Sequence, residues 1–221
     1  MILRLPAGDI AVIKGSFGMG DYFYEPRKGH GLPHDPFKAI VAPRPVGWIS
    51  SIDRTGRVNL APYSFFNAFA SRPPIVGFAT EGWKDSARNV EETGEFVCSL
   101  VSRDLAEAMN ETAAPLPPGD NEMVRAGLAA TASTLVKPPR VARAIAALEC
   151  RKTAIIRLAG VDGVALDTWL ILGEVVGVHM DEAFLRDGYF DTAGARPVAR
   201  CGYAGDYAEV TALFRMTRPP A

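Results

Sequence analysis

The sequence predicts a mainly β protein whose core is a closed or sandwiched antiparallel sheet. Many short apolar and β-branched runs alternate with turns, whereas helical patterns are few and short. The 21 glycines and 17 prolines interrupt the chain too often for long helices. With 221 residues, 48% of them hydrophobic, the chain can bury one large β-rich core or two small ones.

The first 37 residues are predicted to form an N-terminal arm. Residues 5–13 could hold a short strand, and the glycines and prolines that follow break any longer element. An aromatic cluster at residues 21–24 is expected to pack on the main body or on another subunit.

The next segment predicts two pairs of strands. Residues 46–52 are apolar and β-branched, and a turn at 53–56 joins them as a hairpin to a second strand at 58–61. Residues 65–70 and 75–79 predict two more strands, one on each side of a proline-rich turn.

A short helix is predicted at residues 85–92. Asp85 or Ser86 would cap its start and Gly94 would end it. The chain is then expected to return as a strand at residues 96–101.

The second half of the chain continues the β pattern. Helical patterns at residues 104–128 are broken by prolines, residues 143–159 predict one or two strands with a basic middle, and residues 168–180 form a strong β run. We find no internal repeat and no long linker. The sequence therefore predicts one main domain at 38–210 and a short C-terminal tail at 211–221.

Charge and cysteine content narrow the function classes. The formal net charge is −1, which gives no strong field to attract nucleic acid or an anionic membrane. No apolar run approaches the roughly 20 residues that span a bilayer, and the N-terminus lacks the apolar middle of a signal peptide. The three cysteines, Cys98, Cys150 and Cys201, are far apart and odd in number. We expect a cytoplasmic protein without a nucleic-acid or membrane partner.

Residues 84–89, with the sequence Lys-Asp-Ser-Ala-Arg-Asn, predict a phosphate seat. The start of a helix leaves several N–H groups unbonded, and its dipole favours an anion. Ser86 can add a hydroxyl, and Lys84 and Arg88 can add charge-assisted hydrogen bonds. The alternative is an ordinary helix cap with solvated basic neighbours.

The strand at residues 47–51 combines an aromatic ring with hydroxyl groups. Because side chains alternate along a strand, Trp48 and Ser50 share one face, and Ile49 and Ser51 share the other. Gly47 leaves room for a ligand to approach closely. The alternative is a core strand with two incidental serines.

Residues 61–67 predict an irregular turn before an aromatic strand. Pro62 and Tyr63 can expose backbone polar groups to the edge of a ligand, and Asn67 can donate and accept in one plane. The alternative is a β-turn followed by a packed strand. Taken with the two preceding stretches, these groups suit a planar heterocycle with a phosphate tail.

Other familiar sites lack their motifs. His30 and His34 are four residues apart, but no cysteine or carboxylate set completes a metal site, so none is expected. The glycines at residues 15–20 do not have the G-x-G-x-x-G spacing, and the sequence contains neither a Walker A motif nor a G-x-S-x-G elbow.

The order of these pieces resembles the flavin reductase-like family, whose members adopt an FMN-binding split β-barrel with Greek-key-like antiparallel strands and a few short helices. The resemblance covers most of the chain, from about residue 38 to residue 207. The matching stretches, in family order, are residues 43–51, 59–67, 73–77, 84–86, 89, 93–97, 173–176, 187–188, 197–200, 202–203 and 207.

The resemblance implies a homodimer with FMN near the subunit interface. It assigns the isoalloxazine and ribityl lining to Trp48, Ile49, Ser50, Ser51, Pro62, Tyr63, Ser64, Phe65 and Asn67. It assigns the phosphate to Lys84, Ser86 and Asn89, and it implies that Arg200 and Tyr203 close over the cofactor.

The activity that the resemblance implies is an NAD(P)H-dependent flavin oxidoreductase. NADH or NADPH would deliver hydride to N5 of FMN, and the electrons would pass on to free flavin, oxygen or another acceptor. Because the cofactor does the chemistry, no catalytic side chain is expected. Two alternatives stay open: an FMN electron carrier without a nicotinamide site, and a split-barrel protein that binds haem or another ring.

Overall fold

The computed structural model describes residues 20–116 and 120–219. By its internal contacts the chain divides into two units, residues 1–36 and 37–221. The strand predicted at residues 5–13 lies outside the described residues.

The described part of the first unit is a short aromatic segment. It contains one turn of 3-10 helix, η1 (Pro26–Lys28). The Tyr22 hydroxyl donates a hydrogen bond to the His30 carbonyl oxygen over 2.8 Å. The Tyr24 ring meets the His30 ring edge-on with 6.2 Å between centroids. Within this unit, the predicted aromatic cluster therefore folds against its own histidine.

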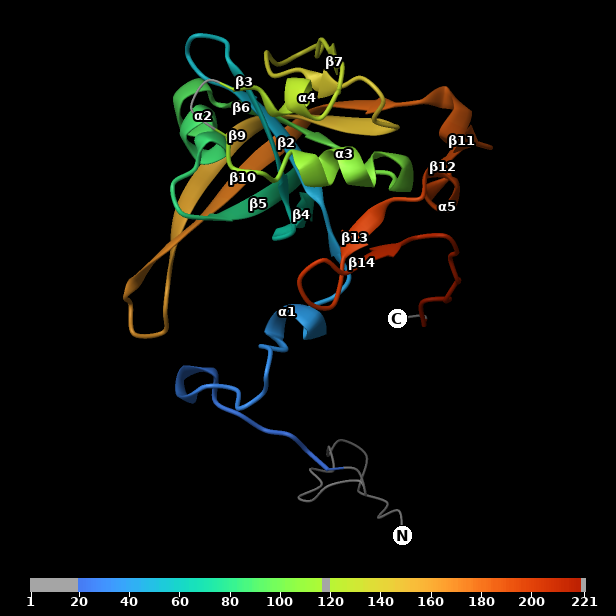
Figure 1. Ribbon diagram of the computed structural model, residues 1–221. Helices are drawn as coiled ribbons and strands as arrows, with labels where there is room; N and C mark the ends of the chain where they lie inside the picture. The colour runs from blue at the N-terminus through green and yellow to red at the C-terminus, as the bar shows by residue number, and fades with distance from the viewer. Residues whose placement is uncertain (1–19, 117–119, 220–221) are drawn as a thin grey trace. The chain divides into compact units, whose positions relative to one another are not determined.

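The second unit is built on a seven-stranded antiparallel sheet, in which the spatial order is β3-β2-β6-β9-β10-β5-β4 (Figure 1). Strands β9 and β10 continue together as a long hairpin beyond their neighbours. The strands are β2 (Gly47–Ile52), β3 (Val58–Tyr63), β4 (Phe66–Ser71), β5 (Pro74–Glu81), β6 (Glu95–Ser99), β9 (Ala146–Ala159) and β10 (Ala165–Met180).

Smaller sheets and short helices complete the described chain. A three-stranded sheet joins β1 (Arg44–Pro45), β13 (Val198–Arg200) and β14 (Tyr207–Glu209), and two pairs join β7 (Ala130–Thr131) to β8 (Arg140–Val141) and β11 (Leu185–Arg186) to β12 (Tyr189–Phe190). The helices are α1 (Phe37–Ile40), α2 (Asp85–Thr93), η2 (Arg103–Leu105), α3 (Ala106–Glu111), α4 (Glu122–Arg125), η3 (Glu182–Phe184) and α5 (Thr192–Ala195).

Strand β2 separates two hydrophobic clusters, because its alternate side chains point to opposite faces. Ile49 belongs to an inner cluster with Phe78, Phe96 and Val90, so α2 packs against the inside of the barrel. The members of the outer cluster are Val46, Trp48, Leu60, Val101, Leu105, Met109, Met123, Val141 and Val198. All six residues of β2 are buried, so this strand is central to the fold.

The predicted hairpins and the helix end are confirmed. Residues 53–56 form the turn between β2 and β3, in which Gly56 N–H donates to the Asp53 carbonyl oxygen over 3.0 Å. Gly94 ends α2 in the left-handed conformation, with φ 75°, which glycine adopts without strain. Residues 143–159 contain one strand, β9, and not two.

Two local predictions were wrong. Helix α2 begins one position after Lys84, which occupies the N-cap in place of Asp85 or Ser86. Asp85 instead pairs with Arg88, and the Ser86 hydroxyl is held from the side. The irregular turn expected at Pro62 is a continuation of β3, paired with Trp48. Proline is tolerated there because β3 is an edge strand.

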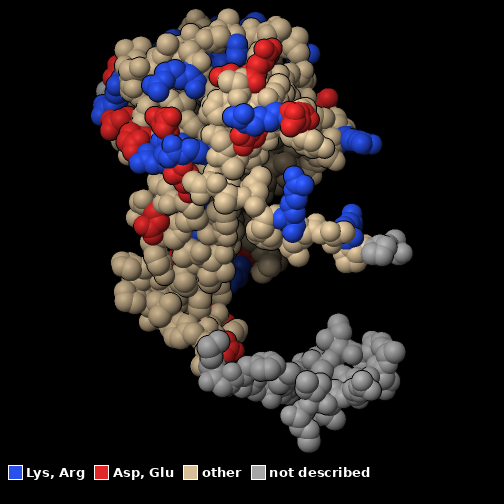
Figure 2. Space-filling model, turned by 90° about the vertical axis from the view of Figure 1, so that its right-hand side faces the viewer, with Lys and Arg blue, Asp and Glu red and all other residues tan. Residues whose placement is uncertain are grey.

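Charges of both signs are interspersed on the surface. Figure 2 shows basic and acidic side chains next to one another over the upper part of one face. Within the ranges that the structure describes, no helix is long and apolar enough to cross a membrane.

Candidate functional site

The candidate site is a cavity at the start of α2. Its volume is about 660 Å³, within the range of small-ligand sites. It receives side chains from β3, from the loop before α2 and from the segment after α3. The lining residues are Asn59, Ala61, Pro62, Tyr63, Trp83, Lys84, Asp85, Ser86, Arg88, Thr112, Ala113, Ala114, Pro115, Leu116 and Glu122. Four predicted site residues, Pro62, Tyr63, Lys84 and Ser86, therefore line one cavity.

The helix start itself offers donors for an anion. Lys84 is the N-cap of α2, and its side chain makes no capping hydrogen bond within the described part of the chain. The first N–H groups of the nine-residue helix are therefore not used by a side-chain cap at that position. Lys84 is exposed and enters no ion pair with a described residue. Among the described residues, the cavity thus has a cation without an ion pair beside a helix N-terminus, where the dipole also favours negative charge.

The Ser86 hydroxyl is oriented from behind. Ser86 is 1% exposed, and its Oγ accepts a hydrogen bond from Asn59 Nδ2 over 2.8 Å. A hydroxyl that accepts one bond keeps its own hydrogen for another acceptor. Asn59 therefore holds Ser86 in place, and the Ser86 hydroxyl can donate to the Tyr63 oxygen or to a group in the cavity.

A second amide-to-hydroxyl bond fixes α2 to the sheet. Asn89 Nδ2 donates to Ser51 Oγ over 3.1 Å, and both residues are buried. Asn59 and Ser51 face one another across the β2–β3 pair. The helix is consequently tied to both strands of one hairpin, which gives the start of α2 a rigid support.

Tyr63 forms a wall of the cavity with a neutral phenol. Burial raises its pKa, and hydrogen bonding with the hydroxyls of Ser86 and Thr80 opposes that shift without cancelling it. Its ring also packs on Phe78, with 4.7 Å between centroids. Tyr63 is therefore a fixed, protonated group beside Ser86 at neutral pH.

Three of the predicted residues on β2 lie in the core. Trp48 is fully buried, and its indole N–H donates to Thr112 Oγ1 over 2.9 Å. Ser50 donates to the Pro139 carbonyl oxygen, and Ile49 packs in the inner cluster. None of these three side chains lines the cavity, and Trp48 reaches it only through its bond to the lining residue Thr112.

The predicted residues after β3 lie apart from the cavity lining. The Phe65 ring is 5.5 Å from Lys38 Nζ, and its carbonyl oxygen accepts from Ala79 N–H over 2.8 Å. Asn67 is exposed on β4, and Ser64 occupies the bend between the two strands.

Arg200 and Tyr203 belong to the three-stranded sheet and the turn after it. Arg200 lies opposite Arg44 in the β1–β13 pair, and its guanidinium is 4.7 Å from the centre of the Tyr207 ring. The Tyr203 N–H donates to Asp206 Oδ2 over 2.8 Å. Neither residue lines the cavity at α2.

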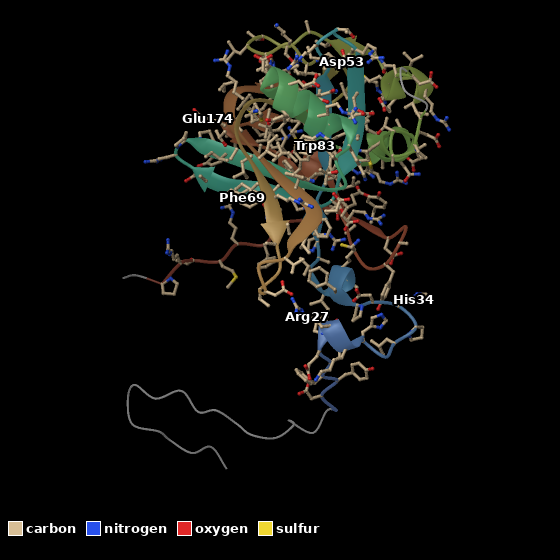
Figure 3. All side chains as sticks on the ribbon, turned by 90° about the vertical axis from the view of Figure 1, so that its left-hand side faces the viewer. Arg27, His34, Asp53, Phe69, Trp83 and Glu174 are labelled. Carbon is tan, nitrogen blue, oxygen red and sulfur yellow. The ribbon has the colours of Figure 1, made fainter. Side chains whose placement is uncertain are left out.

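Sequence reasoning missed several lining residues. Thr112 and Glu122 come from a segment without a local signal, and Glu122 Oε2 accepts from Leu60 N–H over 3.1 Å. Trp83 precedes the seat and lies at the α2 end of β5 (Figure 3). Asn59 had a usable signal, because the predicted hairpin places it opposite Ser51.

A second cavity of about 310 Å³ continues past the helix start. It shares Asn59, Asp85, Arg88, Leu116 and Glu122 with the first cavity. Its remaining lining residues are Asp53, Arg54, Thr55, Arg57, Val58, Asn89, Glu92 and Asp120. The two hollows are thus adjacent at the first turn of α2.

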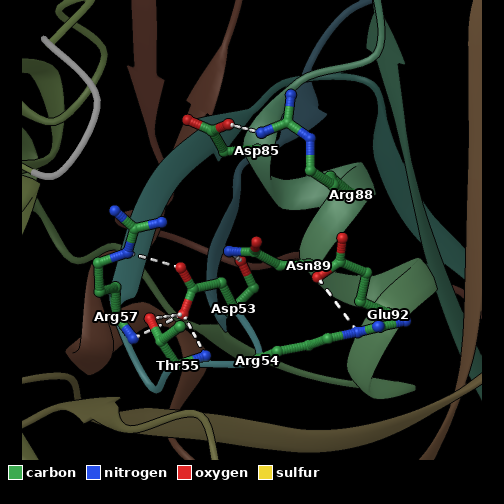
Figure 4. Close-up of polar contacts among 9 residues, drawn as sticks. Asp53, Arg54, Thr55, Arg57, Asp85, Arg88, Asn89 and Glu92 are labelled. Carbon is green, nitrogen blue, oxygen red and sulfur yellow. Dashed lines mark hydrogen bonds and ion pairs between the residues drawn. The ribbon is translucent and has the colours of Figure 1, made fainter.

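Each arginine of the second cavity has a carboxylate partner (Figure 4). Arg57 Nε is 2.6 Å from Asp53, and Arg88 is 2.5 Å from Asp85. Arg54 is 3.7 Å from Glu92.

Asp53 also accepts hydrogen bonds from the hydroxyl and the N–H of Thr55. These bonds and those from Arg57 hold the pKa of Asp53 well below its usual range. Asp53 is therefore ionised at neutral pH.

No group of three or more His, Cys, Asp or Glu residues within 20–116 and 120–219 could hold a metal ion. The chemistry of this region comes from amide, hydroxyl and cationic donors at a helix start.

Comparison with known proteins gives the family. A family model described as "Flavin reductase like domain" matches residues 41–196. An uncharacterized protein of Deinococcus radiodurans is 38% identical over 192 residues, which cover 81% of this chain and 82% of the relative. The match therefore extends over most of both proteins.

Solved structures agree with this assignment. Nitrilotriacetate monooxygenase component B from Bacillus cereus is 29% identical, with a TM-score of 0.78 over 92% of this chain and all of the other. A Shewanella frigidimarina protein described as a flavin reductase with a split barrel domain is 22% identical, with a TM-score of 0.75 over 83% and 90% of the two chains, and shows the fold alone. The chain belongs to the flavin reductase-like family and has its split β-barrel fold.

Proposed function

We propose that this protein is an FMN-dependent oxidoreductase that takes hydride from NADH or NADPH. The observation that carries the proposal is the cavity at the start of α2, where an unpaired lysine, a positioned serine hydroxyl and a helix N-terminus converge. FMN supplies two-electron chemistry at its N5 atom, and the protein supplies binding and orientation. Family membership supports a flavin as the cofactor.

The residues present fit a flavin mononucleotide. The phosphate matches the charge-assisted donors at Lys84 and Ser86, and the cavity of about 660 Å³ has room for the attached group. Pro62 and Tyr63 give an apolar and aromatic wall beside the seat. The donors and the wall lie in one cavity, as a ligand with an anionic tail and a planar ring requires.

The chain's own residues divide the work of binding. Lys84, Ser86 and the first N–H groups of α2 hold the phosphate, and Asn59 and Asn89 keep that helix start against the sheet. Pro62 and Tyr63 are proposed to border the ring with their side chains, and residues 48–51 and 64–67 with their backbone. Arg200 and Tyr203 are proposed to close over the cofactor.

We further propose that two copies of the chain associate, with FMN near their interface, in the cytoplasm. Light scattering on the purified protein measures the oligomeric state directly. A monomer at micromolar concentration would contradict this part of the proposal.

An absorption spectrum, followed by anaerobic addition of each nicotinamide, tests the activity. A yellow protein whose flavin band bleaches rapidly with NADH or NADPH supports the oxidoreductase. A flavin band that neither nicotinamide bleaches indicates the electron carrier instead. A colourless protein that also fails to bind added FMN contradicts both, and a haem spectrum would indicate the ring-binding alternative.

A further inference from the structure

We infer that the second cavity makes the site selective for flavin mononucleotide over flavin dinucleotide, and that its carboxylates, Glu92 in particular, impose the selection. The inference rests on the proposed function, because it takes the phosphate to sit at the start of α2. The residues that line the second cavity would then decide which flavin binds at the seat.

The second cavity is the space next to the seat that an extension of the phosphate would enter. The two hollows share the residues of the first turn of α2, Asp85 and Arg88. A mononucleotide ends at the phosphate, whereas a dinucleotide continues through a second phosphate to an adenosine. A space of about 310 Å³ is at the lower end of the range for small-ligand sites, so size alone does not exclude that extension.

Charge opposes the extension. Five carboxylates line the second cavity against three guanidinium groups, so its lining is net negative. The three arginines are already paired, Arg57 with Asp53, Arg88 with Asp85 and Arg54 with Glu92. A second phosphate would therefore meet uncompensated carboxylates, or it would have to displace one from its arginine.

The two flavins differ in where they carry charge. The terminal phosphate monoester of FMN has a charge of about −1.5 to −2 at neutral pH, all of it at the seat beside Lys84. The dinucleotide spreads its charge over two phosphates, with about one negative charge on each. It thus weakens its bond to Lys84 and places the other charge against the acidic lining.

A change at Glu92 can test the selection between flavins without changing the groups that hold the first phosphate. Glu92 lies seven positions after Asp85, which is about 10 Å along the helix axis from the seat. That separation is about one Debye length at 0.1 M salt. Glu92 also lines the second cavity and not the first. A change of charge at Glu92 should therefore act on a dinucleotide more than on FMN.

The test compares the dissociation constants of riboflavin, FMN and FAD for the full chain after removal of bound flavin. Variants Glu92→Gln and Glu92→Lys are measured beside Glu91→Gln and Glu91→Lys. Glu91 is the neighbouring residue of α2, which pairs with Lys152 over 2.8 Å and lines neither cavity. The Glu92 side chain is 31% exposed, and its Arg54 partner is 76% exposed, so the Glu92 variants should fold.

We expect the wild-type protein to bind FMN more tightly than FAD and more tightly than riboflavin. Glu92→Lys should narrow the FMN-to-FAD ratio about three- to tenfold at low salt, and Glu92→Gln by less. High salt should reduce both effects because it screens the charges. The Glu91 variants should leave the ratio within twofold of wild type.

Equal affinity of the wild-type protein for FMN and FAD, or a ratio that Glu92→Lys does not change, overturns this inference. If FMN still binds more tightly than riboflavin in that case, the phosphate seat and the proposed function stand. If none of the three flavins binds, the proposed function and this inference fail together.

Discussion

Two polar clusters of the barrel differ in what their groups have left to bind: an open cluster at the start of α2 and a closed cluster around Glu149. At the start of α2, Asn59 holds Ser86 and Asn89 holds Ser51, beside a cavity. Around β9, the fully buried Glu149 accepts hydrogen bonds from the N–H groups of residues 134–136 and contacts His179.

The difference lies in the bonding capacity that remains. Glu149 Oε1 takes the Thr134 N–H and the His179 ring nitrogen, and Oε2 takes two more N–H groups, at distances of 2.5 to 3.1 Å. At α2, Lys84 enters no ion pair with a described residue, and the Ser86 hydroxyl can turn its hydrogen from Tyr63 to a ligand in the cavity. A polar cluster therefore indicates a ligand site where some of its hydrogen-bonding capacity is still available. It indicates a role in stability where all of that capacity is used within the protein.

The largest effect should come from breaking the closed cluster. Glu149→Ala leaves three N–H groups without their acceptor, one of them on the buried Val136, and should lower the free energy of unfolding by about 3–5 kcal/mol. Urea denaturation at neutral pH measures this loss. The folded fraction should keep its FMN affinity, because Glu149 does not line the cavity at α2.

Glu182→Ala is the matched control for this loss. Glu182 is an exposed residue of η3, so its removal should change the unfolding free energy by less than about 0.5 kcal/mol. A Glu149→Ala protein as stable as this control would mean that the closed cluster is not structural.

The same carboxylate should make stability depend on pH. Burial raises the pKa of Glu149, but the N–H groups of residues 134–136 and the His179 ring lower it more, so the net shift is downward. A lowered pKa in the folded state stabilises the fold above the ordinary value of 4.5, and that contribution is lost as pH falls through the folded-state pKa.

We therefore expect the urea midpoint of the wild-type protein to approach that of Glu149→Gln between pH 6 and the lowest pH at which both fold. A constant gap across this range would show that Glu149 does not supply the dependence. Glutamine is the suitable replacement because it fills the same space without a charge that titrates.

Breaking the open cluster should act on binding and leave stability intact. Lys84→Ala removes the unpaired cation and should weaken FMN binding by about one to two orders of magnitude, since a charge-assisted hydrogen bond contributes roughly 1.5–3 kcal/mol. Titration of the flavin-free protein with FMN measures the change. Arg88→Ala should cost less, because Asp85 already holds that guanidinium.

Unchanged FMN affinity in both variants would remove the phosphate from the start of α2. If the Lys84→Ala protein also lost several kcal/mol of stability, the contrast between the two clusters would fail.

The same contrast separates the features that the sequence could predict from those that it could not. The turn at residues 53–56, the helix end at Gly94 and the donors at Lys84 and Ser86 are local features, and a window of a few residues contains their whole signal. The split-barrel fold followed from the order of such pieces along the chain. The cap of α2 could not be predicted, because Asn59, 27 positions before Ser86, takes the serine hydroxyl from the side.

The closed cluster and part of the cavity lining had no local signal. Glu149 meets its N–H donors through a loop 13 to 15 residues earlier in the chain. Thr112 reaches Trp48 across 64 positions. Such contacts depend on strand register and loop path, which hydrophobic periodicity does not specify.

A smaller effect on FMN affinity should follow from removing the hydrogen bond that positions Ser86. Asn59→Ala removes the donor to Ser86 Oγ and should weaken FMN binding about three- to tenfold, which corresponds to the net value of one hydrogen bond of roughly 1 kcal/mol. Asn59→Asp keeps the shape but places a negative charge beside the phosphate, so it should weaken binding further than alanine does. Equal affinities for the three proteins would show that Asn59 does not position Ser86.

The smallest effects should come from the three-stranded sheet. Arg200 already stacks on Tyr207, and it must leave that ring before it can close over a cofactor. An exposed cation–π contact is worth about 0.5–1 kcal/mol, so the net gain from closure is small. Arg200→Ala should therefore weaken FMN binding by about threefold or less, as measured by the same titration.

Tyr207→Leu should act in the opposite direction. It releases Arg200 from its resting partner and should strengthen FMN binding about two- to threefold. Opposite signs for the two variants would make the β13–β14 sheet a movable part of the site, in contrast to the rigid seat at α2. A tenfold loss in Arg200→Ala would instead place this arginine among the fixed phosphate or ring contacts, and no change in either variant would separate this sheet from FMN binding altogether.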